Sequence, residues 1–329
     1  MSTKLDQAQR RIEQAKSEFA RLARFAVPSI ERALTEFGDE WRLDFAELIA
    51  SGYEDESDRV AAIRGYAAFA IDSMRRQRRF EETREYPAKT YAEAAAEVYF
   101  NDSYMESQYL PGLLLSHYLW PHHYQQLRFF KQFFVPLIAA TNTPTASRFA
   151  EVGVGTGIYS RTALQLAPEA TGIGYDISQV SARFAARHVE RHGKGARYGV
   201  EVRDVLSEPP DERFDQVICV EVLEHLEDPV SLLVGLRRLV KPEGRLFVTA
   251  ALNAANADHI HLYRTPADVL RQLEEAELYV EHFFFANAYP PARPQLPVPA
   301  AIALVARPMT RPGGTSGGAS PSPGPTGSR

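Results

Sequence analysis

The sequence contains a single cysteine, Cys219, among its 329 residues. One cysteine excludes an intramolecular disulfide and a zinc site built from several thiolates. Apolar runs are short as well, and the run at 133–140 falls far below the roughly 18 residues that a membrane-spanning helix needs. The N-terminal segment lacks the apolar stretch of a signal peptide. We therefore expect a soluble, cytoplasmic protein that has no membrane partner.

The sequence also lacks an excess of basic charge. It has 37 lysine and arginine residues against 42 aspartate and glutamate residues, so its net charge is −5. A chain of net negative charge has no overall field that would gather nucleic acid, although a local basic patch is compatible with this count. Hydrophobic residues make up 45% and charged residues 24%, which is a globular composition and excludes wholesale disorder. We expect a small-molecule partner and no nucleic acid.

Three regions that differ in composition and in the spacing of apolar residues follow one another along the chain. Residues 1–140 carry helical spacing of apolar residues, so we predict a helical domain that binds substrate or forms a lid. Residues 141–307 alternate short apolar runs with helical patterns. Residues 308–329 consist mainly of Pro, Gly, Ser and Thr, and we predict a disordered tail because such a segment buries too little apolar surface. Breaks in the helical region are expected at Pro28, Gly38, Gly52 and Pro87.

The alternation within 141–307 predicts an α/β fold, a Rossmann-like sheet of seven mostly parallel strands. The last two apolar runs, 279–285 and 300–306, flank a proline-rich loop without a long helix between them. That arrangement predicts an antiparallel pair at one edge of the sheet. The five parallel strands are expected at 148–152, 171–176, 198–203, 215–220 and 244–251.

Three glycines mark the end of the first predicted strand, in the segment Glu151-Val-Gly153-Val-Gly155-Thr-Gly157. Glycines at these positions let the backbone turn sharply and let a ligand approach without Cβ clashes. Dinucleotide-binding folds use a related loop with the pattern Gly-x-Gly-x-x-Gly/Ala. Counted from Gly153, the sixth position is Ile158, which departs from that pattern. A nicotinamide-dependent oxidoreductase is therefore disfavoured, but it stays an alternative.

Together with four later segments, this loop resembles the class I S-adenosylmethionine-dependent methyltransferases. The resemblance covers residues 147–307, about half the chain, and its segments follow the order and spacing of the family. The later segments are Gly174-Tyr-Asp176, Asp204 after the third strand, the run from Asp215 to Leu226, and Leu239-Val-Lys-Pro-Glu-Gly-Arg-Leu-Phe-Val.

The resemblance implies S-adenosylmethionine as the cofactor. Asp176 lies 176 − 153 = 23 residues after the first glycine, which places its carboxylate at the end of the neighbouring strand, within reach of a ribose. Its alternative role is that of a helix N-cap, which Ser178 could fill as well. The implied cofactor residues are Gly153, Gly155 and Gly157, Glu151 for the methionine end, Asp176 for the ribose, Asp204 and Val205 near the adenine, and Glu221.

Acidic and imidazole side chains follow the fourth and fifth predicted strands. Glu221 and His225 lie one turn apart, and the segment Asp258-His259-Ile-His261 comes after the next strand. Because these strands are neighbours in a parallel sheet, both loops are expected to open onto the same cleft. Imidazole is poised near neutral pH, so we predict a general base at Glu221, His225, His259 or His261.

A divalent metal held by Glu221, Glu224, His225 and His261 is the less favoured interpretation of this cluster. A similar Glu-x-x-Glu-His with a later histidine occurs in the methyltransferases that modify the 3′-terminal ribose of small RNAs. The match is short, however, and Val-Leu-Glu-His-Leu is also common in members of the class that hold no metal. There Glu224 and His225 mainly shape the loop.

The segment 99–134 is rich in aromatic rings. One interpretation is a lid over the cofactor whose polar ring ends contact the substrate; a helical core and a homodimer interface are the alternatives. His122 and His123 are not expected to form a metal pair, because adjacent residues on a helix do not face one point. The candidate substrate residues are Tyr104, Tyr109, His117 and Tyr118, and the expected core residues are Phe129, Phe130, Phe133 and Phe134.

These patterns together predict an enzyme that transfers a methyl group from S-adenosylmethionine to a small molecule, for example in the biosynthesis of a specialised metabolite. The turn after the fourth strand reads Val-Glu-Val-Leu, which differs from the Asn/Asp-Pro-Pro-Tyr/Phe of nucleic-acid amino methyltransferases. A metal-assisted RNA ribose methyltransferase, a protein methyltransferase and a non-catalytic cofactor-binding protein stay alternatives. The residues leave open whether oxygen, nitrogen or carbon is methylated.

Overall fold

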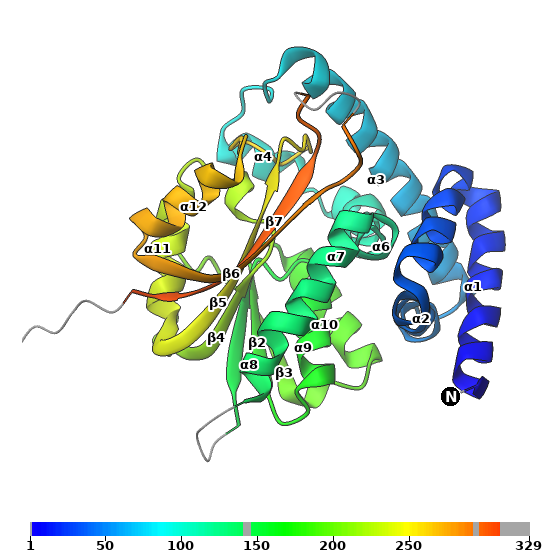
Figure 1. Cartoon of the computed structure of the whole chain (residues 1–329), viewed down its shortest axis with the longest axis horizontal. Helices are drawn as coiled ribbons and strands as arrows, with labels where there is room; N and C mark the ends of the chain where they lie inside the picture. Colours follow the sequence, from blue (N-terminus) through cyan, green and yellow to red (C-terminus); the bar gives the residue numbers. More distant parts are fainter. Residues whose placement is uncertain (1, 141–145, 292–295, 310–329) are drawn as a thin grey trace, which may run out of the picture.

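The computed structural model describes residues 2–140, 146–291 and 296–309. The predicted tail lies outside the described residues beyond Met309, and so does the segment 141–145, at which the predicted domains meet. A central sheet is covered by helices on both faces, and the N-terminal helices lie to one side of it (Figure 1).

A mixed sheet of seven strands forms the centre of the described structure, in the order β3-β2-β1-β4-β5-β7-β6. Neighbouring strands from β3 to β5 are parallel, whereas β7 runs antiparallel between β5 and β6. The predicted fold is confirmed, and the antiparallel pair closes one side of the sheet with β6 at the edge. The strands are β1 (Arg148–Val152), β2 (Thr171–Asp176), β3 (Tyr198–Val202), β4 (Phe214–Cys219), β5 (Val240–Leu252), β6 (Leu278–Asn287) and β7 (Ala300–Pro308).

Successive residues of the central strands face two different cores. Phe149 of β1 packs in the core that lies toward the N-terminal half of the chain, whereas its neighbour Ala150 packs in the core on the opposite face. Such strands are apolar on both faces, which explains the continuous hydrophobic runs in the sequence. Helices α9 (Ile158–Leu166) and α10 (Gln179–Arg191) cover the first face, and α11 (Pro229–Leu239) and α12 (Pro266–Glu275) cover the second.

The N-terminal half is helical, as predicted, and its breaks fall at the predicted residues. Gly38 has a φ of 61° and kinks the second helix, Gly52 ends that helix, and Pro28 lies in its first turn. The helices are α1 (Ser2–Leu22), α2 (Val27–Ser51), α3 (Glu56–Thr83), α4 (Tyr91–Glu97), α5 (Asp102–Tyr104), α6 (Leu110–Leu119), α7 (Pro121–Phe129) and α8 (Val135–Ala139), with π-helical segments η2 (Met105–Tyr109) and η3 (Phe130–Phe134).

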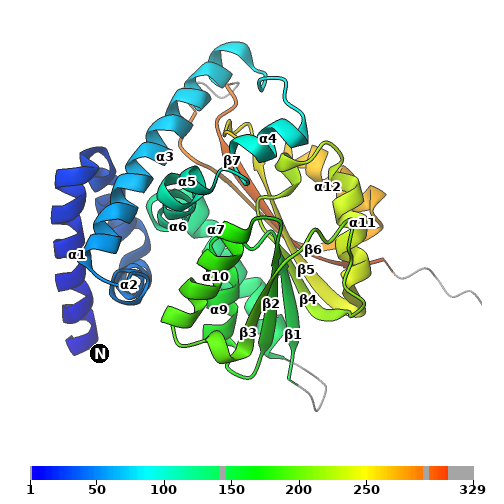
Figure 2. The ribbon, with the colours of Figure 1, turned by 180° about the vertical axis from the view of Figure 1, so that it is seen from behind.

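Aromatic residues of α7 and η3 join the helical half to the sheet. The rings of Phe130 and Phe134 lie 4.9 and 5.5 Å from the ring of Phe247 on β5. Phe129 lies 6.2 Å from the same ring, so the expected core role of these phenylalanines is confirmed. Helix α7 therefore packs directly on the sheet (Figure 2), and the described residues on both sides of the predicted domain boundary share one core.

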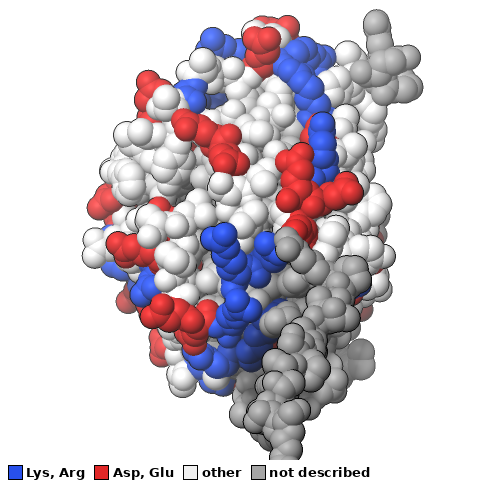
Figure 3. Space-filling model, turned by 90° about the vertical axis from the view of Figure 1, so that its left-hand side faces the viewer, with Lys and Arg blue, Asp and Glu red and all other residues white. Residues whose placement is uncertain are grey.

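The surface offers no indication of a membrane span, since no described helix is long and apolar enough to cross a bilayer. Acidic and basic side chains are interspersed on the face that carries α11 and α12 (Figure 3). Several of them form ion pairs, such as Arg237 with Glu277 at 2.6 Å and Arg271 with Asp268 at 2.6 Å. This face is therefore mixed in sign.

The contact between α3 and η2 depends on a glycine. A Cβ on Gly65 would lie 2.2 Å from the carbonyl oxygen of Ser107, a backbone atom that has little freedom to move. We expect Gly65→Ala to lower the free energy of unfolding by about 1–3 kcal/mol, the usual cost of overpacking. Denaturant unfolding measures this change. Gly199→Ala is the matched control, because a Cβ there meets no atom within 4 Å; equal stabilities of the two variants would contradict this account of the packing.

Candidate active site

One large cavity opens at the carboxyl ends of the parallel strands. Its volume is about 810 Å³, and it is lined by the loops after β1, β2, β3, β4 and β5 together with residues of α3, α6 and α7. The chain order of the parallel strands reverses between β1 and β4, and ligands of open α/β sheets bind at such a point. The helical half thus covers the part of the sheet at which a ligand is expected.

The three glycines after β1 have separate roles. All three have positive φ, 70° at Gly153, 50° at Gly155 and 70° at Gly157. A Cβ on Gly157 would lie 3.0 Å from the Cβ of Ala185, so this glycine allows α9 and α10 to pack closely. A Cβ on Gly155 would meet no atom nearer than 3.7 Å, and the residue lines the cavity. Gly155 therefore leaves room for a ligand beside the backbone.

Two buried carboxyl groups flank the glycine loop. Glu151 accepts hydrogen bonds from the backbone nitrogen of Ser160 at 2.9 Å and from its hydroxyl group. Asp176 accepts from the backbone nitrogens of Gly155 at 3.0 Å and Ser178 at 2.8 Å. Burial raises the pKa of Glu151 to about 8 and that of Asp176 to about 6. Both line the cavity, so both are placed to meet a polar ligand.

The predicted adenine residues lie on the same cavity. Asp204 and Val205 line it from the turn after β3. The carboxylate of Asp204 accepts from the backbone nitrogen of Leu206 and the hydroxyl of Ser207, both at 2.9 Å. Asp204 therefore shapes its own turn, while Val205 offers an apolar surface to a ligand.

Glu221 has an unusual backbone conformation directly after β4. Its φ is 52°, a left-handed conformation that a non-glycine residue adopts at a cost and that is often found at functional sites. The hydroxyl of Thr249 accepts from the backbone nitrogen of Glu221 at 2.9 Å and donates to its side chain at 2.7 Å. Burial raises the pKa of this carboxyl group. Thr249 thus fixes a carboxyl group that lines the cavity.

Glu224 is fully buried on the turn η5 (Leu223–His225), and the part of the chain that the structure describes offers neither oxygen of its side chain a partner of hydrogen-bond geometry. Burial, followed by the nearby Glu221, raises its pKa. Its backbone oxygen accepts from the backbone nitrogens of Ile260 and His261, both at 2.9 Å, which ties the loop after β4 to the loop after β5. The two loops therefore meet, as predicted.

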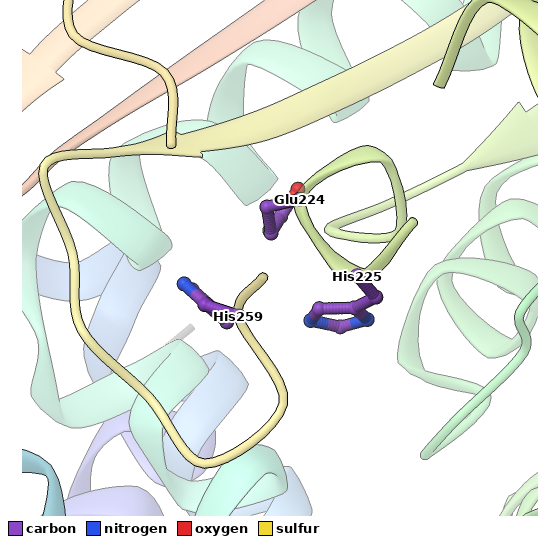
Figure 4. A group of neighbouring side chains, drawn as sticks. All are labelled: Glu224, His225 and His259. Atoms are coloured by element: carbon purple, nitrogen blue, oxygen red, sulfur yellow. The ribbon is translucent and has the colours of Figure 1, made fainter. Parts of the chain in front are cut away.

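Among the described residues, one group of three side chains is arranged to hold a metal ion. Ligand atoms of Glu224, His225 and His259 all lie within 4.8 Å of one another. Figure 4 shows Glu224 and His225 on one turn, beside the loop that carries His259. Compared with the predicted metal set, His259 takes the place of His261, and Glu221 is not part of the group.

His225, Asp258 and His259 form a buried polar network at the cavity. The Nε2 atom of His225 lies 3.4 Å from Oδ2 of Asp258. The same oxygen accepts from the hydroxyl groups of Tyr109 at 2.5 Å and Tyr99 at 3.0 Å. Nδ1 of His259 lies 2.7 Å from the backbone oxygen of Ala254. A carbonyl only accepts, so Nδ1 carries the proton and Nε2 of His259 keeps a free lone pair.

Several predicted site residues lie away from the cavity. His261 lines a separate recess beside α12, where its Nε2 is 3.3 Å from Nε2 of Gln272, because the loop turns its side chain outward two residues after His259. Tyr118 is a core residue whose hydroxyl accepts from Arg161 at 2.8 Å. Tyr104 is half-buried and packs against the ring of Tyr109 at 6.0 Å. The structure therefore places these three residues outside the cavity lining, contrary to the prediction.

The predicted substrate residues Tyr109 and His117 do line the cavity. His122 and His123 line it as well, with 4.3 Å between their ring centroids, but they are not part of the group of described side chains that could hold a metal. The sequence analysis also missed Tyr99 and the role of Asp258. Their signal was the position of Asp258 beside two histidines and of Tyr99 in the ring-rich segment.

Comparison with known proteins agrees with this geometry. Residues 150–246 match a family model described as a methyltransferase domain. The chain is 28% identical over 163 residues to a ubiquinone biosynthesis O-methyltransferase of Xanthomonas axonopodis pv. citri, covering 44% of this chain and 67% of the relative. It is 36% identical over 97 residues to the protein of the same name from Pseudomonas entomophila, covering 30% and 41%. The similarity thus spans only part of these relatives and centres on the sheet domain.

A solved structure extends the likeness of the fold. An O-methyltransferase family protein from Burkholderia thailandensis superimposes with a TM-score of 0.51 over 78% of this chain and 74% of its own, at 13% identity. Together, the sheet order, the glycine loop and the family match support a methyltransferase domain of the class I, S-adenosylmethionine-dependent type in this chain. The site fits that cofactor, because Gly155 leaves space for it and buried carboxyl groups stand on both sides of the loop.

The raised pKa of Glu151 makes stability depend on pH. Between pH 4.5, its usual pKa, and about pH 8, the unfolded chain loses this proton while the folded chain keeps it. The folded state is therefore favoured most at low pH, and this contribution is lost as the pH rises to about 8. Glu151→Gln keeps an acceptor for Ser160 and removes the titration. We expect the stability difference between variant and wild type to change across this window and to be constant above it.

Urea unfolding at a series of pH values measures the effect, with the same m-value required of both proteins. Unfolding free energies that run parallel for the two proteins from pH 4.5 to 8 would show that Glu151 ionises normally.

Proposed function

We propose that this protein transfers the methyl group of S-adenosylmethionine to a hydroxyl group of a small-molecule acceptor. The observation that carries the proposal is a single cavity that runs from the glycine loop to His225 and His259 beneath the helical half. A cavity of about 810 Å³ lies in the range of small-molecule sites. The names of the similar proteins, which are O-methyltransferases, support oxygen as the methylated atom.

The cofactor residues of this proposal are those around the glycine loop. Gly155 and Asp176 would hold the adenosyl part together with Asp204 and Val205, and Glu151 would face the methionine part. When bound, S-adenosylmethionine supplies a methyl group activated by a sulfonium. The protein then contributes alignment of donor and acceptor, which can account for several kcal/mol of the barrier.

The acceptor would lie between His225 and His259 on one side and the helices on the other. Nε2 of His259 has a lone pair that can take the proton of a hydroxyl group, because Nδ1 is fixed on the oxygen of Ala254. His225 stands beside it, with 5.2 Å between the ring centroids. Asp258 lies next to His225 and balances the positive charge that a captured proton would bring.

The ribose assignment predicts a large effect of Asp176→Ala on cofactor binding. The substitution removes a carboxylate from the cavity and two hydrogen bonds from the loop backbone. We expect the affinity for S-adenosylhomocysteine to fall by about 100-fold, or about 3 kcal/mol. Isothermal titration calorimetry measures this affinity. Asp211→Ala removes an exposed carboxylate of the same domain and should bind like wild type; equal affinity of both variants would refute the assignment.

The proton-acceptor role predicts that His259→Asn slows turnover far more than it weakens binding. We expect kcat to fall by about 10²–10⁴-fold, the usual contribution of a general base. The assay follows methylated product by mass spectrometry in a panel of hydroxylated aromatic compounds. His282→Asn is the control, since this residue is exposed on β6.

Two results would contradict the role of His259 as the proton acceptor. Full activity of His259→Asn would exclude its role as base. Loss of wild-type activity on chelation, restored by a divalent cation, would instead assign Glu224, His225 and His259 to a metal site, which their mutual distances allow.

A further inference from the structure

Three histidines of the helical half stand on the cavity wall opposite the sheet. His117 lies on α6, and His122 and His123 lie in the first turn of α7. All three line the cavity and are almost fully buried, with exposed fractions of 4%, 7% and 9%. We call these three residues the imidazole wall. None of the roles proposed above for the cofactor or the proton acceptor uses them.

The change of direction between α6 and α7 brings the ring of His117 close to the rings on α7. Trp120 between α6 and α7 has an extended backbone, with φ −102° and ψ 116°, so the two helices meet at an angle. The ring centroid of His123 lies 4.3 Å from that of His122 and 5.5 Å from that of His117. The ring of Trp120 stacks on His122 at 6.1 Å with an angle of 11° between the planes. The wall therefore combines nitrogen atoms with a flat aromatic surface.

The imidazole wall has hydrogen-bonding capacity that the protein does not use. The Nδ1 atoms of His117 and His122 are buried and have no partner among the described residues. Most buried polar groups in proteins are paired, so two unpaired nitrogens in side chains that line a cavity indicate capacity for a further polar partner, such as a ligand or a bound water. Nδ1 of His123, by contrast, is 3.0 Å from the hydroxyl of Ser116.

The wall is uncharged at neutral pH. Burial lowers the pKa of His117 to about 4 and that of His122 to about 3, and burial together with the neighbouring histidines also lowers the pKa of His123 well below its usual range. A neutral imidazole offers one donor and one acceptor, which matches a hydroxyl group or, through the donor alone, a carbonyl. It does not supply the positive charge that would offset burial of a carboxylate or phosphate.

The rest of the cavity has few groups that could supply such a charge. Of the described residues that line it, only two are lysine or arginine, and one of these, Arg32, is exposed. Arg203 lies over the ring of Tyr175 at the β2–β3 end, on the cofactor side. The acidic residues that line the cavity are more numerous: Glu151, Asp176, Asp204, Glu221, Glu227 and Asp228. Glu151 keeps its proton at neutral pH, but the other acidic residues still outnumber the two arginines, so the cavity disfavours an anionic acceptor.

We infer that the imidazole wall is the acceptor-binding site and that it takes an uncharged aromatic ring carrying hydroxyl or carbonyl groups. The ring would lie against the part of Trp120 that lines the cavity, beside Phe69 and His122, which stack on the same indole at 5.9 and 6.1 Å. The nitrogens of His117 and His122 would bond the polar substituents. This inference rests on the proposed function, because it names the acceptor class of the same cavity.

Tryptophan fluorescence can test the site without any methyl transfer. The chain has two tryptophans, and Trp41 is fully buried outside the cavity lining, so a change on ligand addition reports on Trp120. The probes are catechol and 3,4-dihydroxybenzoate, which share a dihydroxylated ring and differ by one carboxylate. We expect catechol to bind saturably and 3,4-dihydroxybenzoate to bind at least ten-fold more weakly. The Trp41→Phe variant, in which Trp120 is the only tryptophan, confirms the source of the signal.

Substitutions of His117 and His122 test whether their ring nitrogens bind the ligand. His122→Leu and His117→Leu remove the unpaired Nδ1 atoms, and each should weaken catechol binding at least ten-fold. His122→Asn and His117→Asn place a polar atom near the same position and should restore most of the affinity. His282→Leu, on the exposed part of β6, should have no effect.

Equal binding of the two probes, no binding of catechol, or unchanged affinity in the folded leucine variants would overturn the inference. If the leucine variants do not fold, the comparison of the two probes on the wild-type protein still decides. Failure of the proposed function would look different: catechol would change the fluorescence, but calorimetry would show no binding of S-adenosylhomocysteine or mass spectrometry no methylated product.

Discussion

The buried carboxylate of Asp258 is the constraint on which the arrangement of this molecule depends. It is fully buried in the loop after β5, where an unpaired charge would be strongly destabilising. Tyr99 and Tyr109 donate to it from the helical half, and His225 approaches it from the loop after β4. Burial alone would raise the pKa of Asp258, but these neighbours outweigh it and the pKa is lowered. Besides the shared aromatic core, the helical half and the loops at the end of the sheet thus meet at one buried charge.

The loop after β5 also accepts hydrogen bonds from other residues of the helical half. The hydroxyl of Tyr86 donates to the oxygen of Ala254 at 2.5 Å, and that oxygen also holds His259. Lys89 donates to the oxygen of Ala257 at 3.0 Å. The glycine loop, by contrast, takes its hydrogen bonds from β2 and α9 within the sheet domain. The side of the cavity that we propose for the cofactor is therefore held within the sheet domain, whereas the side that we propose for the acceptor is built together with the helical half.

Prediction from the sequence succeeded where local pattern decides structure. The strands and the glycine loop are encoded by apolar runs and by residues with few conformational alternatives. Prediction failed where an irregular backbone decides which way a side chain points. Whether His259 or His261 faces the cavity depends on an irregular loop, and the approach of His117 to His123 depends on the angle between α6 and α7 at Trp120. The π-helical segment η2 shifts the helical phase, so spacing could not tell which tyrosines point inward.

Burial gives the acceptor side of the cavity two properties at once. Helices packed over the sheet exclude water, which strengthens electrostatic interactions and protects the reacting groups. The same burial lowers the pKa of the histidines around the acceptor, including His259, whose pKa falls to about 4 although Asp258 opposes the shift. These imidazoles are consequently neutral, so they can accept a hydrogen bond or a proton without first releasing one. Carboxyl groups gather near the glycine loop instead, and their oxygens suit the cationic sulfonium of the proposed donor. The two sides of the cavity thus differ in the way that the proposed methyl transfer from a cation to a neutral acceptor requires.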